Sequence, residues 1–400
     1  MNEGKVVFTG KILIVGFGSI GQGLMPLLFK HLQLNPNQVS ILTADNNGED
    51  VAKTYNTTFE VLALTKENFK EVLDRRLLAS DVLLNLSVDV SSYDLIEYCQ
   101  KNNTLYLDTC TEPWAGWYTN SSLSLAERSN HFLRKNVLSL RDTYSNKSAT
   151  ALITHGANPG LVSHFVKQAL LNIASDIGLK TQEPTSKEEW ANLAKKLDIK
   201  VIQIAERDTQ LSSVSKKDDE FCNTWSVEGL YSEACQPSEL GWGTHETVLP
   251  REGHFFDENK SAIYINKPGY TSKVTTFTPS LGVCDAKIIT HAEALSISDY
   301  FTTKDSQGEV TYRPTVYYAY RPSDATMQSL QELETVTKGV LHNKQRIMMS
   351  DLTSGYDELG VLLIGHKKNA YWYGSRLDIT DARKLAPNNN ATSLHFFYDQ

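Results

Sequence analysis

Long apolar runs are missing from this sequence of 400 residues, and none approaches the roughly 20 residues that a membrane-spanning helix needs. Residues 1–11 include Glu3 and have no apolar core, so they do not resemble a signal peptide. Cysteine is scarce, with five residues in all, and no pair has the C-x-x-C spacing of a zinc or redox site. We therefore expect a soluble, cytoplasmic protein that has no disulfide bonds and no bound metal.

An excess of basic residues is also missing, because 39 Lys and Arg stand against 47 Asp and Glu, for a net charge of −8. Nucleic acids bind basic surfaces, so we expect no nucleic-acid partner. The acidic balance suits a cationic substrate but does not by itself select one. The motifs G-x-S-x-G and H-E-x-x-H do not occur, which leaves hydrolase functions without support.

Short apolar runs alternate with helical patterns over the first 150 residues. This alternation predicts a parallel sheet with helices on both faces, the Rossmann type of α/β fold. We therefore assign residues 1–150 to a dinucleotide-binding domain. The expected elements are strands at 11–16, 39–43, 81–86 and 104–108 and helices at 22–32 and 92–101.

Beyond residue 150 the strands become shorter and aromatic residues more frequent, which predicts a second, mixed α+β domain at residues 151–375. Asn158 is placed to cap a helix that continues to about residue 177, with Pro159 at its first position. Residues 392–398 are predicted to form a strand with little after it, so we expect the C-terminal segment 376–400 to be incomplete. Further strands are expected at 151–154, 201–205, 261–265 and 315–320.

Residues 16–21 read GFGSIG and match the motif G-x-G-x-x-G between a predicted strand and a predicted helix. The first glycine permits a tight turn, the second a close approach of the backbone to a pyrophosphate, and the third close packing of helix on strand. Asp45 follows the second strand, where an acidic residue binds the ribose hydroxyls, and no arginine adjoins it, which favours NAD over NADP. The alternative is a tight turn without a ligand.

Carboxylates follow the third and fourth predicted strands, at the edge of the sheet where ligands bind in such folds. Asp89 comes soon after strand 81–86, and Glu112 lies in a Thr-Glu-Pro-Trp sequence after strand 104–108. The alternative for Asp89 is a helix cap, and that for Glu112 is an exposed loop carboxylate. The neighbouring Cys110 is interpreted as a small buried hydrophobe.

The second domain offers a further group of acidic and aromatic residues. Glu206 ends the strand 201–205, and Trp225 and Glu233 flank a loop that contains Gly229. Carboxylates attract ammonium groups, and an indole face binds them by cation–π contact worth about 0.5–2 kcal/mol. The alternative for Trp225 is a core residue.

His291 and Glu293 form an H-A-E sequence and are predicted to be alternate residues of a strand, which would share one face. A histidine is the best available proton carrier near neutral pH. The alternative is a structural histidine with satisfied hydrogen bonds.

The chain contains the stretches GFGSIGQG, NLSVD, LYLDTCTEPWAGWY, THGANPGLVSHF, AERDTQ and NTWSVEG. From about residue 8 to the end, these stretches resemble the bacterial homospermidine synthases, a family related to the saccharopine dehydrogenases. The resemblance implies a transferase of polyamine biosynthesis in which bound NAD acts as a hydride shuttle. One putrescine amine is oxidised to an imine, ammonia leaves, a second putrescine attacks, and the Schiff base is reduced by the NADH just formed.

The resemblance also implies which residues line the site. Trp225 would hold a cationic intermediate over its indole face, His291 would line the same pocket, and Asn158 would lie near the nicotinamide. Glu206 and Glu233 are both candidates for the base, and the choice between them stays open. The second domain would bind the substrate and form a homodimer. The implied acidic lining is Asp89, Glu112, Glu206, Glu233 and Glu293, and the predicted cofactor contacts are Gly16, Gly18, Ser19, Ile20, Gly21, Asp45, Ser87, Thr109 and Asn158.

Two rival functions remain at this point. A saccharopine-dehydrogenase-like oxidoreductase acting on an amino acid would need arginines to clamp carboxylates, and Arg207 next to Glu206 is available for that role. A catalytically silent NAD-binding scaffold would keep the glycines but would have no need for carboxylates that converge on one pocket.

Overall fold

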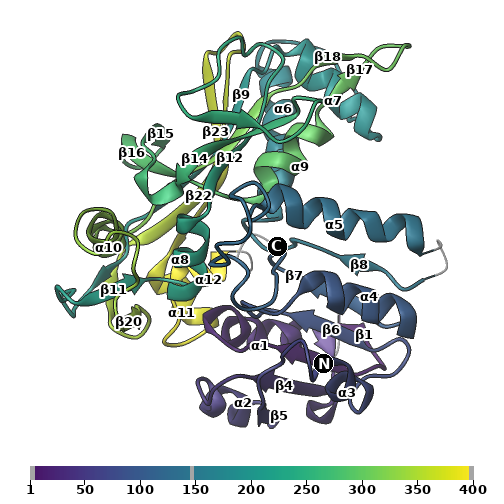
Figure 1. The fold of residues 1–400 in the computed structure, drawn as a ribbon, viewed down its shortest axis with the longest axis vertical. Helices are drawn as coiled ribbons and strands as arrows, with labels where there is room; N and C mark the ends of the chain where they lie inside the picture. The colour runs from purple at the N-terminus through teal and green to yellow at the C-terminus, as the bar shows by residue number, and fades with distance from the viewer. Residues whose placement is uncertain (1–4, 145–147, 396–400) are drawn as a thin grey trace.

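A six-stranded parallel sheet organises the first part of this computed structural model, which describes residues 5–144 and 148–395 (Figure 1). The strand order is β5-β4-β2-β6-β7-β8, so the order reverses between β2 and β6. The reversal opens a crevice at the carboxyl ends of these two strands, where doubly wound sheets bind ligands. The strands are β2 (Ile12–Val15), β4 (Val39–Thr43), β5 (Thr58–Val61), β6 (Val82–Asn85), β7 (Leu105–Asp108) and β8 (Ala151–Leu152).

Helices cover both faces of this sheet, which explains why its strands are continuous apolar runs. All four residues of β2 are buried. Helix α1 (Ser19–His31) follows directly through the glycine-rich turn and buries Met25 and Leu27. The strands and helices predicted for this part of the chain are found at their expected places. The other helices here are α2 (Glu49–Thr54), α3 (Phe69–Asp74), α4 (Ser92–Asn102) and α5 (Asn130–Thr143).

A nine-stranded mixed sheet forms the second part of the chain. Its order is β13-β14-β12-β19-β9-β22-β23, and β16 joins beside β19 with β15 as its partner. The central strand β9 pairs in parallel with β19 and antiparallel with β22. The strands are β9 (Val201–Asp208), β12 (Pro237–Gly241), β13 (Gly253–Phe255), β14 (Ala262–Pro268), β15 (Val274–Thr278), β16 (Gly282–Ile289), β19 (Thr315–Arg321), β22 (Tyr356–Ile364) and β23 (Ala370–Asp378).

Helices and short strand pairs complete the second part. Its largest core cluster joins the buried face of α6 to the sheet, with Ile202 and Ile204 fully buried. The helices are α6 (Leu161–Asp176), α7 (Lys187–Lys196), α8 (Val227–Cys235), α9 (Ala292–Tyr300), α10 (Asp324–Thr335), α11 (Ile379–Leu385) and α12 (Ala391–Leu394). Its two-stranded pairs are β10 (Leu211–Ser212) with β21 (Leu352–Ser354), β11 (Glu220–Asn223) with β20 (Lys344–Ile347) and β17 (Thr303–Lys304) with β18 (Val310–Tyr312). A further pair, β1 (Val6–Val7) with β3 (Leu32–Gln33), belongs to the first part of the chain.

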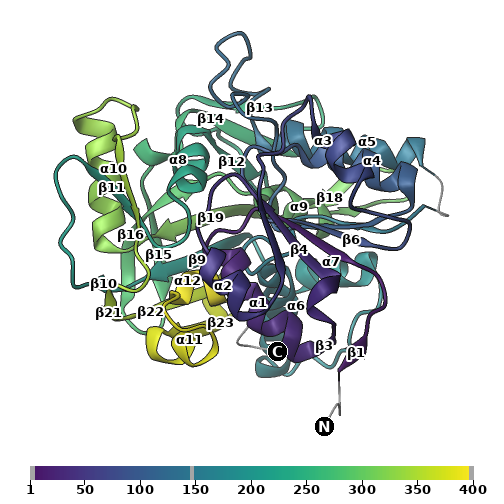
Figure 2. The same cartoon turned by 90° about the horizontal axis from the view of Figure 1, so that it is seen from below.

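The last helices return to the first domain, and α12 lies beside α1 in both views (Figures 1 and 2). The Asn389 side chain donates a hydrogen bond of 3.0 Å to the carbonyl of Ser19. The prediction of a strand at 392–398 is wrong for residues 392–394, which are helical, and residues 396–398 lie outside the described part. A helical turn is favoured there because the Asn390 side chain caps it by accepting the N–H of Ser393.

Two further local predictions are corrected. Helix α6 begins at Leu161, so Asn158 is not its cap and Pro159 is not its first residue. Gly160 precedes the helix with φ +132°, and a Cβ there would lie 2.2 Å from the carbonyl oxygen of Gly156, so the tight loop requires glycine. Gly229 is not in a loop but inside α8, because the Ser226 side chain caps a helix that starts one residue later.

His291 and Glu293 are not strand residues. Strand β16 ends at Ile289, His291 is the residue before α9, and Glu293 lies in the first turn of that helix. A carboxylate in a first turn is favoured by the free N–H groups there. The two side chains still meet, as described below. No helix within residues 5–144 and 148–395 is long and apolar enough to cross a membrane.

Candidate active site

The glycine-rich turn between β2 and α1 leaves room for a phosphate group. Gly16 has φ +86°, and a Cβ added there would lie 2.6 Å from the Cα of Ser87, so only glycine fits. A Cβ on Gly18 would meet nothing within 4 Å, which shows open space above the turn. Gly18 caps α1 without any side-chain hydrogen bond, so N–H groups of the first turn can bind an anion. The turn therefore fits a dinucleotide pyrophosphate.

The other predicted cofactor contacts surround this turn. Asp45 is exposed just beyond β4, and its carboxylate accepts the N–H of Asn47 at 2.8 Å. The hydroxyl of Ser87 donates to Asn85 at 2.5 Å. Thr109 lies just beyond the end of β7. These positions agree with a cofactor lying across the strand ends, and the individual contacts stay predictions.

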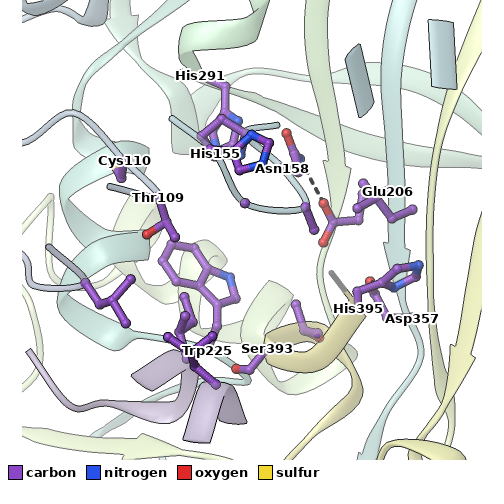
Figure 3. A pocket seen from close by; sticks show the side chains of 18 of the residues that line it. Thr109, Cys110, His155, Asn158, Glu206, Trp225, His291, Asp357, Ser393 and His395 are labelled. Atoms are coloured by element: carbon purple, nitrogen blue, oxygen red, sulfur yellow. Dashed lines mark hydrogen bonds and ion pairs between the residues drawn. The ribbon is translucent and has the colours of Figure 1, made fainter. Parts of the chain in front are cut away.

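A cavity of about 280 Å³ lies between the strand ends of the first sheet and the face of the second sheet (Figure 3). Apolar side chains such as Leu84 and Leu107 line its first-domain side. Trp225, just before α8, extends its indole into the cavity. The cavity brings together these predicted residues: Ile20, Thr109, Asn158, Glu206, Trp225, Glu233 and His291.

Glu206 projects from β9 into the cavity and is almost fully buried. Its carboxylate accepts the amide N–H of Asn158 at 3.0 Å and the hydroxyl of Tyr318 at 2.8 Å. Burial raises the pKa of Glu206 to about 8, and the charge of Asp357 adds to the increase while the two hydrogen bonds oppose it. A carboxyl group in this state can exchange a proton near neutral pH.

A second acidic group surrounds His291. The imidazole Nδ1 lies 3.2 Å from the Glu293 carboxylate and its Nε2 lies 3.9 Å from that of Glu233. Burial lowers the pKa of His291, but the hydrogen bond with Glu293 and the nearby negative charges outweigh this and raise it. Burial raises the pKa of Glu233 to about 7, against the opposing charge of His291. Glu293 itself lies behind His291 and accepts the N–H of Gly160 instead of lining the cavity.

Glu112 and Asp89 lie beside the cavity and not in its lining. The thiol of Cys110, which does line it and is only half-buried, donates to the Glu112 carboxylate at 3.2 Å. Burial raises the pKa of Glu112 to about 8, so the alternative of an exposed loop carboxylate is wrong. Asp89 is exposed, and its pKa is raised by partial desolvation and by the charge of Glu228 on α8. The cap of α4 is Ser91, so the alternative role for Asp89 is wrong as well.

Sequence reasoning missed several residues that line the cavity. The ring of Tyr318 packs against that of His291 at a tilt of 44°, with 4.6 Å between ring centroids, and its hydroxyl donates to Glu206. Asp357 and His395 form a buried pair with 2.8 Å between Oδ2 and Nδ1. The available signal for Asp357 in the sequence was an acidic residue next to the apolar run that forms β22. Nothing local pointed to His395, which lies in the predicted strand that is helical instead. Other polar lining residues that were missed are His155, Thr392 and Ser393.

The buried carboxyls predict how stability depends on pH. Because the folded-state pKa of Glu112 is about 8 and its ordinary value is 4.5, its favourable contribution is complete below pH 4.5 and is lost as pH rises through 8. Between pH 6 and pH 8, the free energy of unfolding should fall by about 2 kcal/mol more in the wild type than in Glu112→Gln, because one pKa unit corresponds to about 1.36 kcal/mol. Urea unfolding without cofactor at the two pH values measures this. An equal pH dependence for both proteins would contradict the buried, protonated state.

Family models match both halves of the chain. The saccharopine dehydrogenase NADP binding domain matches residues 12–152, and the saccharopine dehydrogenase C-terminal domain matches residues 156–396. Together with the glycine-rich turn and the cavity, these matches define a two-domain, dinucleotide-dependent enzyme of the saccharopine dehydrogenase type.

Curated relatives narrow the family. Homospermidine synthases from Blastochloris viridis and Mesorhizobium japonicum are each 43% identical, over 96% of this chain and 81% of their own length. The crystal structure of the homospermidine synthase from Legionella pneumophila in complex with NAD has a TM-score of 0.91 and 44% identity, and the match covers 99% of this chain and 83% of that one. The chain belongs to the homospermidine synthase family. The predicted family, fold class and enzyme class are thereby confirmed.

Proposed function

We propose that this protein transfers an aminobutyl group from one putrescine to another, with release of ammonia and with NAD as a bound hydride carrier. The observation that carries this is the cavity itself, where Trp225 and the acidic groups Glu206 and Glu233 converge at the carboxyl edge of the dinucleotide domain. No Lys or Arg is found among the described residues that line it. Such a lining favours a diammonium ligand over an amino acid, whose carboxylate needs a cation.

The rival oxidoreductase loses its proposed clamp in this arrangement. Arg207 follows Glu206 in β9, so its side chain points to the opposite face of the sheet from the cavity. The silent scaffold is disfavoured because two acidic groups with raised pKa values face one enclosed space.

The two carboxyl groups in the cavity suit the two ends of a diamine. A buried ammonium group needs acceptors that replace its hydration, and Glu206 and Glu233 offer them from different elements. The indole of Trp225 supplies a cation–π face within the same cavity. The Oδ1 atom of Asn158 has no hydrogen-bond partner among the described residues and is free to accept an N–H group of a ligand. This supports the predicted place of Asn158 beside the reacting groups.

NAD would be held by the glycine turn (Gly16, Gly18 and the start of α1), and it would supply the hydride acceptor for the diamine and the hydride donor for the condensed imine. Glu206 takes the proton from the substrate ammonium, because its pKa of about 8 makes it a better proton acceptor than an ordinary carboxylate. The departing nitrogen gains a proton before it leaves as ammonia. His291 and Glu233 are placed to supply that proton, because both line the cavity and the His291 Nε2 lies 3.9 Å from the Glu233 carboxylate.

The reaction is tested with putrescine and catalytic NAD, by mass spectrometry of the amines, an ammonia assay and NADH absorbance. We expect homospermidine and ammonia in equal amounts without net NADH. Net NADH formation without a condensed amine would instead favour the oxidoreductase. Tight NAD binding without any product would support only the dinucleotide site and would contradict the proposed transfer reaction.

Trp225→Ala tests the cation–π contact. We expect kcat/KM to fall about 2- to 30-fold, because such contacts contribute about 0.5–2 kcal/mol. Trp225→Phe keeps an aromatic face and should recover most of the activity. If the alanine and phenylalanine variants were equally impaired, the indole would act through its shape or packing and not through cation binding.

We also propose that the protein forms a homodimer through its second domain and works in the cytoplasm. Size-exclusion chromatography with light scattering tests the first point. The boundaries at residues 150 and 375 stay predictions, although β8 extends the first sheet to Leu152.

A further inference from the structure

Three carboxyl side chains project from the same face of the second sheet, and two of them, Glu206 and Asp357, line the cavity. Glu206 and Asp208 are alternate residues of β9, and Asp357 on β22 pairs directly with Asp208 in the antiparallel register. Their exposed fractions are 6%, 3% and 1%. Side chains in directly opposed or diagonal positions of a sheet lie close enough to interact. Three such charges cannot be buried together without compensation.

Neutral donors serve two of these carboxylates. Asp208 accepts the hydroxyl of Thr224 at 2.7 Å and the backbone N–H of Gln210 at 2.8 Å. Among residues 5–144 and 148–395, only the amide of Asn158 and the hydroxyl of Tyr318 donate hydrogen bonds to Glu206.

Asp357 differs from the other two, because it pairs with an imidazole. His395 follows α12 and lies with its Nδ1 2.8 Å from Oδ2 of Asp357. Both side chains are 1% exposed. Within the part of the chain that the structure describes, Asp357 is the one of the three carboxylates that forms an ion pair. The charge of Asp357 raises the pKa of Glu206 and that of His395 lowers it, so both partners act on the proposed base.

We propose that His395 is a positioning residue for the aminobutyl transfer, which holds a positive charge against Asp357 and thereby makes it easier for Glu206 to ionise and act as the base. The proposal rests on the proposed role of Glu206. It assigns a function to the C-terminal turn, which delivers this charge from a segment more than 180 residues beyond Glu206. His291 cannot substitute, because it is engaged with Glu293 and Glu233 on the other side of the cavity (Figure 3).

The pH dependence of Glu206 is set by the groups that face it from several elements. A test of His395 leaves all of them unchanged apart from Asp357, its partner in the ion pair. Arg207 and Glu358 belong to the opposite face of the sheet by strand alternation. The titratable groups around Glu206 are Asp208 on β9, Tyr318 and Tyr320 on β19, Asp357 on β22, Glu233 on α8, His155 after β8, His291 before α9 and His395 after α12.

The pH profile of kcat/KM for putrescine tests the proposal. His395→Gln keeps a hydrogen-bonding side chain but removes the charge, so we expect the acidic limb to move up by about one pH unit or more. The double variant His395→Gln/Asp357→Asn removes both charges of the pair and should return the limb to its wild-type position. His366→Gln, in another buried histidine that contacts the backbone near the β22–β23 turn, should leave the profile unchanged.

An unshifted limb in His395→Gln would overturn the proposal, as would a uniform loss of rate that the double variant does not restore. Thermal unfolding and NAD binding are followed for each protein. If His395→Gln does not fold, the double variant tests the proposal by itself. It should fold, because it buries no unpaired charge, and it should keep the wild-type acidic limb. Glu206→Gln distinguishes a failure of the proposed role of His395 from a failure of the proposed role of Glu206. If it abolishes the limb while His395→Gln leaves it unmoved, only the role of His395 fails, whereas an unaltered profile in Glu206→Gln removes Glu206 as the base.

Discussion

Replacing Glu206 by glutamine is expected to lower kcat by about 10²- to 10⁴-fold, the usual contribution of a general base. The expected loss is specific to catalysis, because glutamine can still accept from Asn158 and Tyr318. Stability should hardly change near neutral pH. The pKa of Glu206 is about 8, so the folded apoenzyme already carries the carboxyl mostly as its neutral form, which glutamine imitates.

Steady-state kinetics with putrescine, together with thermal unfolding and NAD titration, measure this effect. The wild-type kcat/KM should rise about tenfold per pH unit below pH 8 and level off above it, since the base must be ionised in the free enzyme. Glu309→Gln is a matched control, because Glu309 is exposed in the β17–β18 turn. A wild-type kcat in Glu206→Gln would assign the proton transfer to another group, and Glu233 is the other candidate for the base.

The first sheet could be predicted from the sequence because its information is local. Each strand is a short apolar run that ends at polar or turn-forming residues, as β4 (Val39–Thr43) illustrates by matching its predicted bounds. Helical spacing between the strands then forces parallel pairing and a common carboxyl edge. Glu206, Glu233, Trp225 and His291 converge for a related reason, since their motifs recur in the family that the sequence resembles.

The missed residues depend on contacts between distant segments. Asp357 belongs to the site only because β22 pairs with β9 in one register, and a shift by one residue would turn it away. His395 depends on the return of the C-terminal helices to α1 and the second sheet. The strand prediction for the H-A-E sequence was wrong for a different reason. Alternation fits a strand, but the N–H groups at the start of α9 favour a helix there, and His291 and Glu293 meet in either arrangement.

Substituting glycines in the dinucleotide turn should separate folding from cofactor binding. Gly18 has φ −72°, which alanine adopts without strain, and a Cβ there meets no protein atom within 4 Å. We expect Gly18→Ala to fold with wild-type stability when NAD is absent. The added methyl group would occupy the space through which the backbone approaches a pyrophosphate, so the Kd for NAD should rise at least about tenfold. Calorimetric titration and thermal unfolding with and without NAD measure both quantities.

Gly16→Ala is the informative contrast, because the same methyl group is placed where the protein itself has no room. The φ of +86° and the 2.6 Å approach to Ser87 predict destabilisation of about 1–3 kcal/mol even without NAD. At a concentration 100 times the wild-type Kd, NAD stabilises the wild type by about 2.7 kcal/mol, and a tenfold weaker Kd leaves about 1.4 kcal/mol of that in Gly18→Ala. If Gly18→Ala bound NAD as tightly as the wild type, the pyrophosphate would lie elsewhere. The expected outcome is that two chemically identical substitutions in one turn differ in what each displaces, which is protein backbone at Gly16 and cofactor at Gly18.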